Sequence, residues 1–121
     1  MAYASAVELT LLEITRNGIS SDEDLVAADG DHGNKFADNG RTFLRAINAS
    51  AGDIEITVHA ERTIDGLVVP DLTVTVKATG DEDGLDDLLI GPFTANFRQT
   101  DGYVWCEYDD VTTFTVGAFR I

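Results

Sequence analysis

Oxygen-bearing side chains gather most densely in residues 20–40, SSDEDLVAADGDHGNKFADNG. Within this segment Asp29, Asp31 and Asn34 stand two and three positions apart, a spacing that lets an extended loop turn several oxygens toward one hard cation. The EF-hand pattern is not completed, because glycines occupy the positions of its third acidic residue and its final glutamate. The segment predicts a candidate cation site at these three residues, with a solvated acidic loop as the alternative.

Two other acidic runs offer the same pair of interpretations. Each supplies oxygen ligands for a cation, and each is also typical of a loop that is solvated. Paired carboxylates also serve glycosidases, but among 22 acidic residues some pair always lies at the required separation. The number of carboxylates therefore gives no information on whether the chain is a glycosidase. The runs are Asp22, Glu23 and Asp24, and then Asp81, Glu82, Asp83, Asp86 and Asp87.

No nucleophile with a matching base is evident. Cys106 is the sole cysteine, which excludes an intrachain disulfide and a cysteine-based metal site. Its apolar context, YVWCEY, favours a buried structural thiol. His32 and His59 stand in unrelated contexts, and the sequence has no phosphate-binding glycine loop, nucleophile elbow or histidine-pair metal spacing. We therefore expect no catalytic residue, no resident cofactor and no enzymatic activity.

The charge balance restricts the partners. Eight basic and 22 acidic residues give a formal net charge of −14, which argues against binding nucleic acid through phosphates or an anionic membrane surface. No apolar run approaches the roughly 20 residues of a membrane span. A surface rich in aspartate and poor in lysine resembles proteins of salt-in haloarchaea and their viruses, where molar salt screens repulsion to about 3 Å. An ordinary acidic protein is the alternative.

The elements that must position these residues are strands. Apolar and polar residues alternate with period two, thirteen threonines suit exposed strand faces, and Asn-Gly or Asp-Gly pairs mark turns. Phe43 and Leu44 are apolar in opposite phase, which predicts a strand buried on both faces. Residues 6–15 are expected to form one strand, with a helix as the alternative. The other expected strands are 41–48, 54–62, 67–69, 72–78, 88–93, 103–108 and 111–121.

This pattern predicts one all-β domain over residues 1–121, an antiparallel β-sandwich of seven or eight strands. The layout is jelly-roll-like or immunoglobulin-like, and strand spacing does not distinguish the two. Residues 20–40 are expected to form a long acidic loop with a short strand at 25–27, and loops of that length are usually functional. Leu25, Val26 and Phe36 are apolar within this polar stretch, so we expect them to contact a partner.

Several motifs in the second part of the chain occur together in a known family. An Asn39–Gly40 turn precedes R-T-F-L at 41–44, V-T-V follows at 74–76, and I-G-P-F at 90–93. From residue 33 onward the chain resembles small β-sandwich proteins encoded among the capsid and connector genes of tailed viruses. That family has no catalytic motif. The resemblance implies a virion structural protein of the head, a capsid decoration or minor capsid subunit that is assembled in the host cytoplasm.

The resemblance also implies the partners: the major capsid protein and further copies of this chain. Combined with the acidic composition, it implies a haloarchaeal tailed virus. A head–tail connector component is one alternative, and a calcium- or carbohydrate-binding β-sandwich module is another. A secreted module would be expected to carry a signal peptide or to belong to a longer chain, and the sequence opens with no such peptide.

Overall fold

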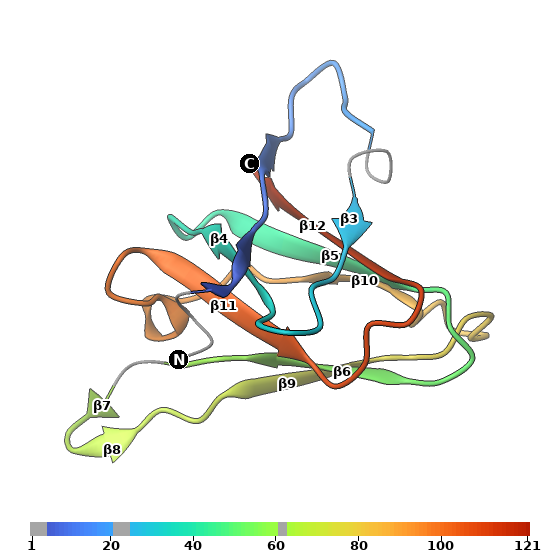
Figure 1. Ribbon diagram of the computed structural model, residues 1–121. Helices are drawn as coiled ribbons and strands as arrows, with labels where there is room; N and C mark the ends of the chain where they lie inside the picture. Colours follow the sequence, from blue (N-terminus) through green and yellow to red (C-terminus); the bar gives the residue numbers. More distant parts are fainter. Residues whose placement is uncertain (1–4, 21–24, 61–62) are drawn as a thin grey trace.

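The computed structural model describes residues 5–20, 25–60 and 63–121, and it places two mixed sheets face to face (Figure 1). The predicted all-β sandwich is thereby confirmed. Sheet A has the order β1-β4-β11-β6-β9, formed by β1 (Val7–Glu8), β4 (Asn34–Ala37), β11 (Tyr103–Tyr108), β6 (Ile54–Val58) and β9 (Leu72–Val76). Sheet B has the order β10-β5-β12-β2, formed by β10 (Asp87–Ile90), β5 (Thr42–Asn48), β12 (Phe114–Arg120) and β2 (Leu11–Glu13), with β3 (Val26–Ala27) also paired to β12.

The core lies between the sheets and consists of every second residue of the long strands. Ile54, Ile56 and Val58 of β6 are fully buried against Leu44 and Ala46 of β5, because strand side chains alternate between the two faces. Other fully buried side chains of this core are Phe36, Phe114, Val76, Val104 and Val116.

The N-terminal strand differs from its prediction. Residues 6–15 do not form one strand: β1 pairs in parallel with β4 of sheet A, and β2 pairs in parallel with β12 of sheet B. The segment crosses from one layer to the other at Leu9, whose side chain is buried in the core. The sandwich is therefore not wholly antiparallel, and its strands outnumber the predicted seven or eight because several are only two or three residues long.

Residues 25–40 also contain more regular structure than the predicted loop. The predicted short strand at 25–27 is present as β3, antiparallel to β12. However, β4 lies between β1 and β11 inside sheet A, where Asn34 and Phe36 are fully buried. The prediction of one loop up to residue 40 is therefore wrong over 34–37, because the Asp-, Gly- and Asn-rich composition hid a four-residue strand with two inward positions.

A short hairpin extends past the ends of β6 and β9 and is drawn at the lower left of Figure 1. Its strands β7 (Thr63–Ile64) and β8 (Leu67–Val68) pair around Asp65 and Gly66, as the Asp-Gly pair predicts. Both turn residues have positive φ, 51° and 80°, the combination that a two-residue hairpin turn requires. We call residues 63–68 the arm. It is a separate two-stranded sheet and joins neither layer of the sandwich.

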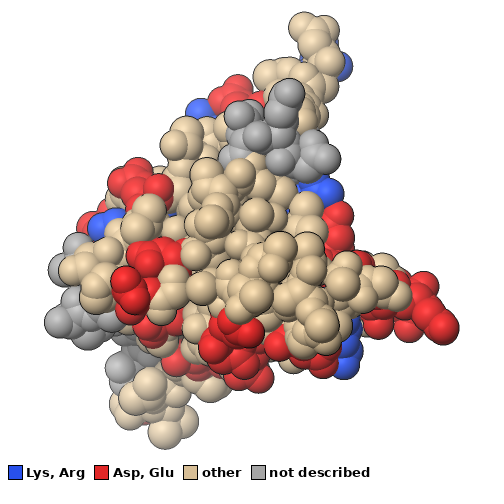
Figure 2. All heavy atoms as spheres, turned by 45° about the vertical axis from the view of Figure 1, so that its right-hand side comes forward, with Lys and Arg blue, Asp and Glu red and all other residues tan. Residues whose placement is uncertain are grey.

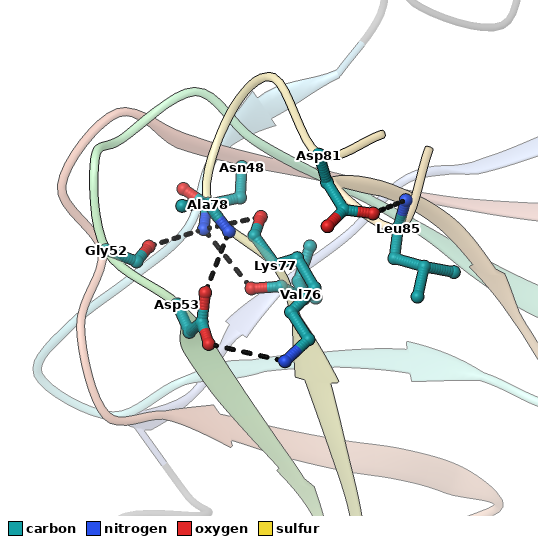
Figure 3. Close-up of polar contacts among 8 residues, drawn as sticks. All are labelled: Asn48, Gly52, Asp53, Val76, Lys77, Ala78, Asp81 and Leu85. Carbon is teal, nitrogen blue, oxygen red and sulfur yellow. Dashed lines mark hydrogen bonds and ion pairs between the residues drawn. The ribbon is translucent and has the colours of Figure 1, made fainter. Parts of the chain in front are cut away.

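Asn48 links the two layers at the opposite end of the molecule (Figure 3). Its buried amide donates to the carbonyls of Gly52, Val76 and Lys77 at 2.8, 3.2 and 3.1 Å, which connects the end of β5 to the end of β9. Beside it, Asp53 accepts the Ala78 N–H at 2.9 Å and lies 3.6 Å from the Lys77 ammonium. Because a buried amide is costly to leave unpaired, this network fixes how the sheets meet.

Candidate functional site

The predicted cation ligands do lie close together, but they bind each other. The Asn34 amide oxygen accepts the Asp29 N–H at 3.2 Å and the Tyr108 hydroxyl at 2.8 Å. Its nitrogen donates to the Val7 carbonyl at 3.1 Å, and Asp29 accepts the Asp31 N–H at 3.0 Å. Both lone pairs of the Asn34 oxygen are thus engaged. The geometry makes Asn34 a buried anchor that ties β1 and β11 to β4.

The acidic runs have a local structural explanation. Asp81 accepts the N–H group of Leu85 at 3.0 Å (Figure 3) and that of Asp83 at 3.2 Å. Asp86 accepts the N–H of Gly80 at 3.1 Å. A short carboxylate reaches such turn N–H groups without strain. The run of Asp22, Glu23 and Asp24 lies outside the described residues. Within the described ranges, nine aspartates accept a backbone N–H: 29, 38, 53, 71, 81, 86, 101, 109 and 110.

Carboxylates nevertheless dominate the charged surface. On the face drawn in Figure 2, Asp and Glu gather along the lower part and on the projection at the right, while Lys and Arg form small separate spots. Among the residues that the structure describes, no group of three or more His, Cys, Asp or Glu side chains is arranged to hold a metal ion.

The outward face of sheet A carries a histidine between two carboxylates. The His59 Nε2 lies 2.7 Å from Glu107 Oε1, and its Nδ1 lies 3.3 Å from Asp71 Oδ2. The ring stacks on Trp105 with centroids 4.0 Å apart. Both contacts are hydrogen bonds at once only when both ring nitrogens carry a proton. Asp71 also accepts the Ala60 N–H at 2.8 Å, so the cluster closes the base of the arm.

The rest of this outward face is polar and internally paired. Trp105 is 5% exposed and donates its indole N–H to the His32 carbonyl at 2.9 Å. Tyr103 donates to Glu8 at 3.2 Å, and Lys35 lies 5.5 Å from the centre of its ring. The hydrogen bond to Glu8, followed by the negative charge of that carboxylate, raises the pKa of Tyr103. His59, which sequence reasoning left unassigned, therefore lies in a network that satisfies its own polar groups.

The outward face of sheet B is apolar and hollowed. Phe43 of β5 stacks on Phe119 of β12, with centroids 5.8 Å apart and ring planes 17° apart. Beside them, Leu89 of β10 is 67% exposed, and the side chains of Ile14 and Ile19 are 41% and 39% exposed. Together they border a cavity of about 280 Å³. We call it the Phe43 pocket, defined by Ile14, Gly18, Ile19, Phe43, Arg45, Leu89 and Phe119.

A second hollow lies beside β3, where β1 passes into β2. Its volume is about 440 Å³, and Val26, which is 48% exposed, is part of its lining. Leu25 is half-buried and packs over Gly117, where an added Cβ would collide with it. We call this the Val26 hollow, defined by Val7, Glu8, Leu9, Thr10, Leu12, Val26, Ala27, Val116 and Gly117.

The expected partner contacts therefore divide. Val26 lines a surface hollow and Leu25 lies at its border, so both are placed where a partner can reach them. Phe36 is fully buried and packs on Phe93 with ring centroids 5.6 Å apart. The expectation that it contacts a partner is corrected by its burial, since an inward strand position belongs to the core. The sequence analysis did not identify Phe119 and Leu89, which line the Phe43 pocket, as candidate partner contacts.

Cys106 is a buried thiol, as its apolar context predicts. It points from β11 into the core, where desolvation raises its pKa to about 12. A thiol that is neutral at physiological pH and closed off from solvent is a poor nucleophile.

Comparisons with protein-family models, with curated proteins and with solved structures find no match for this chain. In the described part of the chain, no helix has the length and apolar character needed to cross a membrane. A proposal of function therefore starts from the surfaces of the molecule.

Proposed function

We propose that this chain is a non-enzymatic structural protein of a virion, a capsid decoration or minor capsid subunit that binds the major capsid protein of a haloarchaeal tailed virus. The observation that carries the proposal is a pair of surface hollows with exposed apolar residues, the Val26 hollow and the Phe43 pocket, in a chain whose net charge is −14. Contiguous exposed apolar surface on a highly charged protein is characteristic of a binding surface for another protein.

The Val26 hollow is the proposed docking surface for the major capsid protein. It combines exposed Val7 and Val26, 50% and 48% accessible, with the partly buried Leu12. Four separate strands, β1, β2, β3 and β12, line it, so its shape depends on the folded sandwich and not on one loop. A partner that fills it removes apolar surface from water, at about 25 cal/mol for each Å².

The acidic composition supports the haloarchaeal part of the proposal. Molar salt screens the repulsion among 22 carboxylates, which is strong in dilute buffer. We expect the thermal unfolding midpoint to rise steeply as KCl increases from tenths molar to molar concentrations. A midpoint that is flat across this range would contradict a halophilic origin and leave an ordinary acidic protein.

A head–tail connector component is the alternative within the same class, because it would use the same apolar surfaces. The position in the particle separates the two, since a decoration subunit binds the capsid shell and a connector component lies at the head–tail junction. In the part of the chain that the structure describes, no observation favours a calcium- or carbohydrate-binding module. The Asn34 oxygen is engaged by protein donors, and His59 covers the Trp105 ring on which a sugar would stack.

Purified particles provide the test. We expect quantitative mass spectrometry to find this chain beside the major capsid protein, and Val26→Asp to reduce its incorporation at least tenfold. The matched control is Thr75→Asp, which introduces the same charge at an exposed strand position on the outward face of sheet A. Absence of the chain from particles, or normal incorporation of Val26→Asp, would overturn the proposal.

A further inference from the structure

The molecule has two unpartnered apolar features that cannot meet within one chain. Leu67 and Val68 of the arm are 74% and 77% exposed, at the end of β6 and β9. The Phe43 pocket faces outward from the other layer, on β5, β10 and β12. Figure 1 shows the arm extending away from the sandwich on the side opposite to the sheet that carries β5 and β12. The whole thickness of the sandwich therefore separates them.

Their charges are complementary. Arg45 lines the pocket and pairs with Asp87 at 2.6 Å, and Arg16 lies in the loop between the lining residues Ile14 and Gly18. Arg120 follows Phe119 in β12 and pairs with Glu13 at 2.7 Å. Arg41 lies at the same end, because its carbonyl accepts the N–H of the residue after Arg120. Four of the eight basic residues thus lie in or next to the segments that line this pocket, against the two carboxylates of Glu13 and Asp87, in a strongly acidic chain.

The arm presents the opposite charge beside its apolar residues. Asp65 is exposed at the tip, next to the two large apolar side chains of β8. A two-stranded hairpin has little stability of its own in water, so covering its apolar side chains stabilises it. The occupant that suits the pocket is an apolar segment with a carboxylate, and the arm is such a segment.

We propose that the arm of one copy docks into the Phe43 pocket of a second copy, with Leu67 and Val68 on the stacked rings and Asp65 toward the arginines. The inference rests on the proposed function in one respect: it supplies the contact between neighbouring decoration subunits. Because the two surfaces differ, the contact is head-to-tail, and it generates a ring when the rotation closes and a chain of subunits when it does not.

Engineered cysteines test the contact directly, since the native Cys106 is buried. A tagged Leu67→Cys variant is mixed with an untagged Leu89→Cys variant in molar KCl and treated with a short bismaleimide. We expect this mixed covalent dimer to form at least five times faster than the one obtained when Thr75→Cys replaces Leu89→Cys. Thr75 is the control because it is exposed on the outward face of sheet A. Equal rates for the two pairs would overturn the proposal.

Sedimentation velocity of the otherwise native chain gives an independent measurement. We expect concentration-dependent association that is lost in Leu67→Asp and retained in Thr73→Asp, an exposed control on β9. Circular dichroism verifies that both variants remain folded. A monomeric native chain at all concentrations, or unchanged association of Leu67→Asp, would overturn the inference.

The two proposals fail in different experiments. Crosslinking of the pure chain without its presence in particles leaves the arm contact standing and overturns the virion function. The reverse outcome is normal incorporation into particles, with Leu67→Cys crosslinked to the major capsid protein and not to Leu89→Cys. That result leaves the virion function standing and overturns the arm contact.

Discussion

The outward faces of the two sheets differ, although the inward faces are equally apolar. On sheet A, His59, Glu107 and Asp71 pair with each other over Trp105, so the polar groups find partners within the chain. On sheet B, Phe43 and Leu89 remain accessible around a pocket. The core requires apolar residues on inward positions only. An apolar outward face is therefore not explained by folding of one chain, and it is the better guide to binding.

This comparison predicts that the two faces respond differently to substitution. Changes on the face of sheet A should reduce the free energy of unfolding and leave association intact. Changes at exposed positions on the face of sheet B, such as Leu89, should reduce association and leave the free energy of unfolding intact.

Trp105→Ala should have the largest effect. The side chain is 5% exposed, stacks on His59 and donates to the His32 carbonyl, so its removal should lower the free energy of unfolding by about 3–5 kcal/mol. Urea unfolding followed by circular dichroism measures the change. Native tryptophan fluorescence at the wavelength of a fully exposed indole would show that the face is not closed as described.

The interior shared by both sheets gives a reference that depends on neither outward face. Burial raises the Cys106 pKa from 9.0 to about 12, so above pH 9 the unfolded chain releases a proton that the folded chain keeps. Stability is therefore unaffected below pH 9 and falls progressively between about pH 9 and pH 12. Cys106→Ala should flatten this alkaline decline. A native thiol that reacts with iodoacetamide at pH 8 as fast as the unfolded chain would contradict the burial.

His59→Phe tests the polar pairing with the aromatic stack retained. We expect a loss of about 1 kcal/mol, because the two carboxylate contacts are partly exposed and exposed ion pairs contribute little. Urea unfolding measures it, and self-association by sedimentation should match the native chain. Loss of association with unchanged stability would reverse the roles given to the two faces.

Leu89→Ser should have the smallest effect on folding and a clear one on binding. Its side chain is 67% exposed, so the free energy of unfolding should change by less than about 0.5 kcal/mol. The same substitution should weaken self-association, because Leu89 is part of the Phe43 pocket. Destabilisation by several kcal/mol would place Leu89 in the core, against the comparison.

Much of the fold could be predicted from alternation alone. Residues 103–108 form β11 with the predicted bounds, and the strand predicted at 41–48 is β5, which begins one residue later, at Thr42. The crossing of the first segment at Leu9 could not be predicted, because period two is the same whichever sheet a strand joins. The strand at 34–37 was hidden by its turn-rich composition, although Phe36 is a core residue.

The candidate sites were harder to predict than the strands. Phe43 and Leu44 indicated a strand with apolar groups on both faces, and only Leu44 is covered completely. Sequence pattern gives the phase of a residue but not whether another element lies over it. Likewise, the aspartates of 81–87 allowed a cation site or a solvated acidic loop, and the structure shows Asp81 and Asp86 accepting turn N–H groups. Their Asp rather than Glu identity was the available signal, because the shorter side chain suits turns.

The position of β12 has a consequence for folding kinetics. This strand pairs with β5, β3 and β2, and its partner Leu12 is separated from Phe119 by most of the chain. Proteins dominated by such distant pairings fold in milliseconds to seconds, because closing long loops costs entropy before the contacts form. Until β12 arrives, β5 and β2 have open edges. A newly made chain therefore passes through an interval in which its strands are exposed to pairing with other chains.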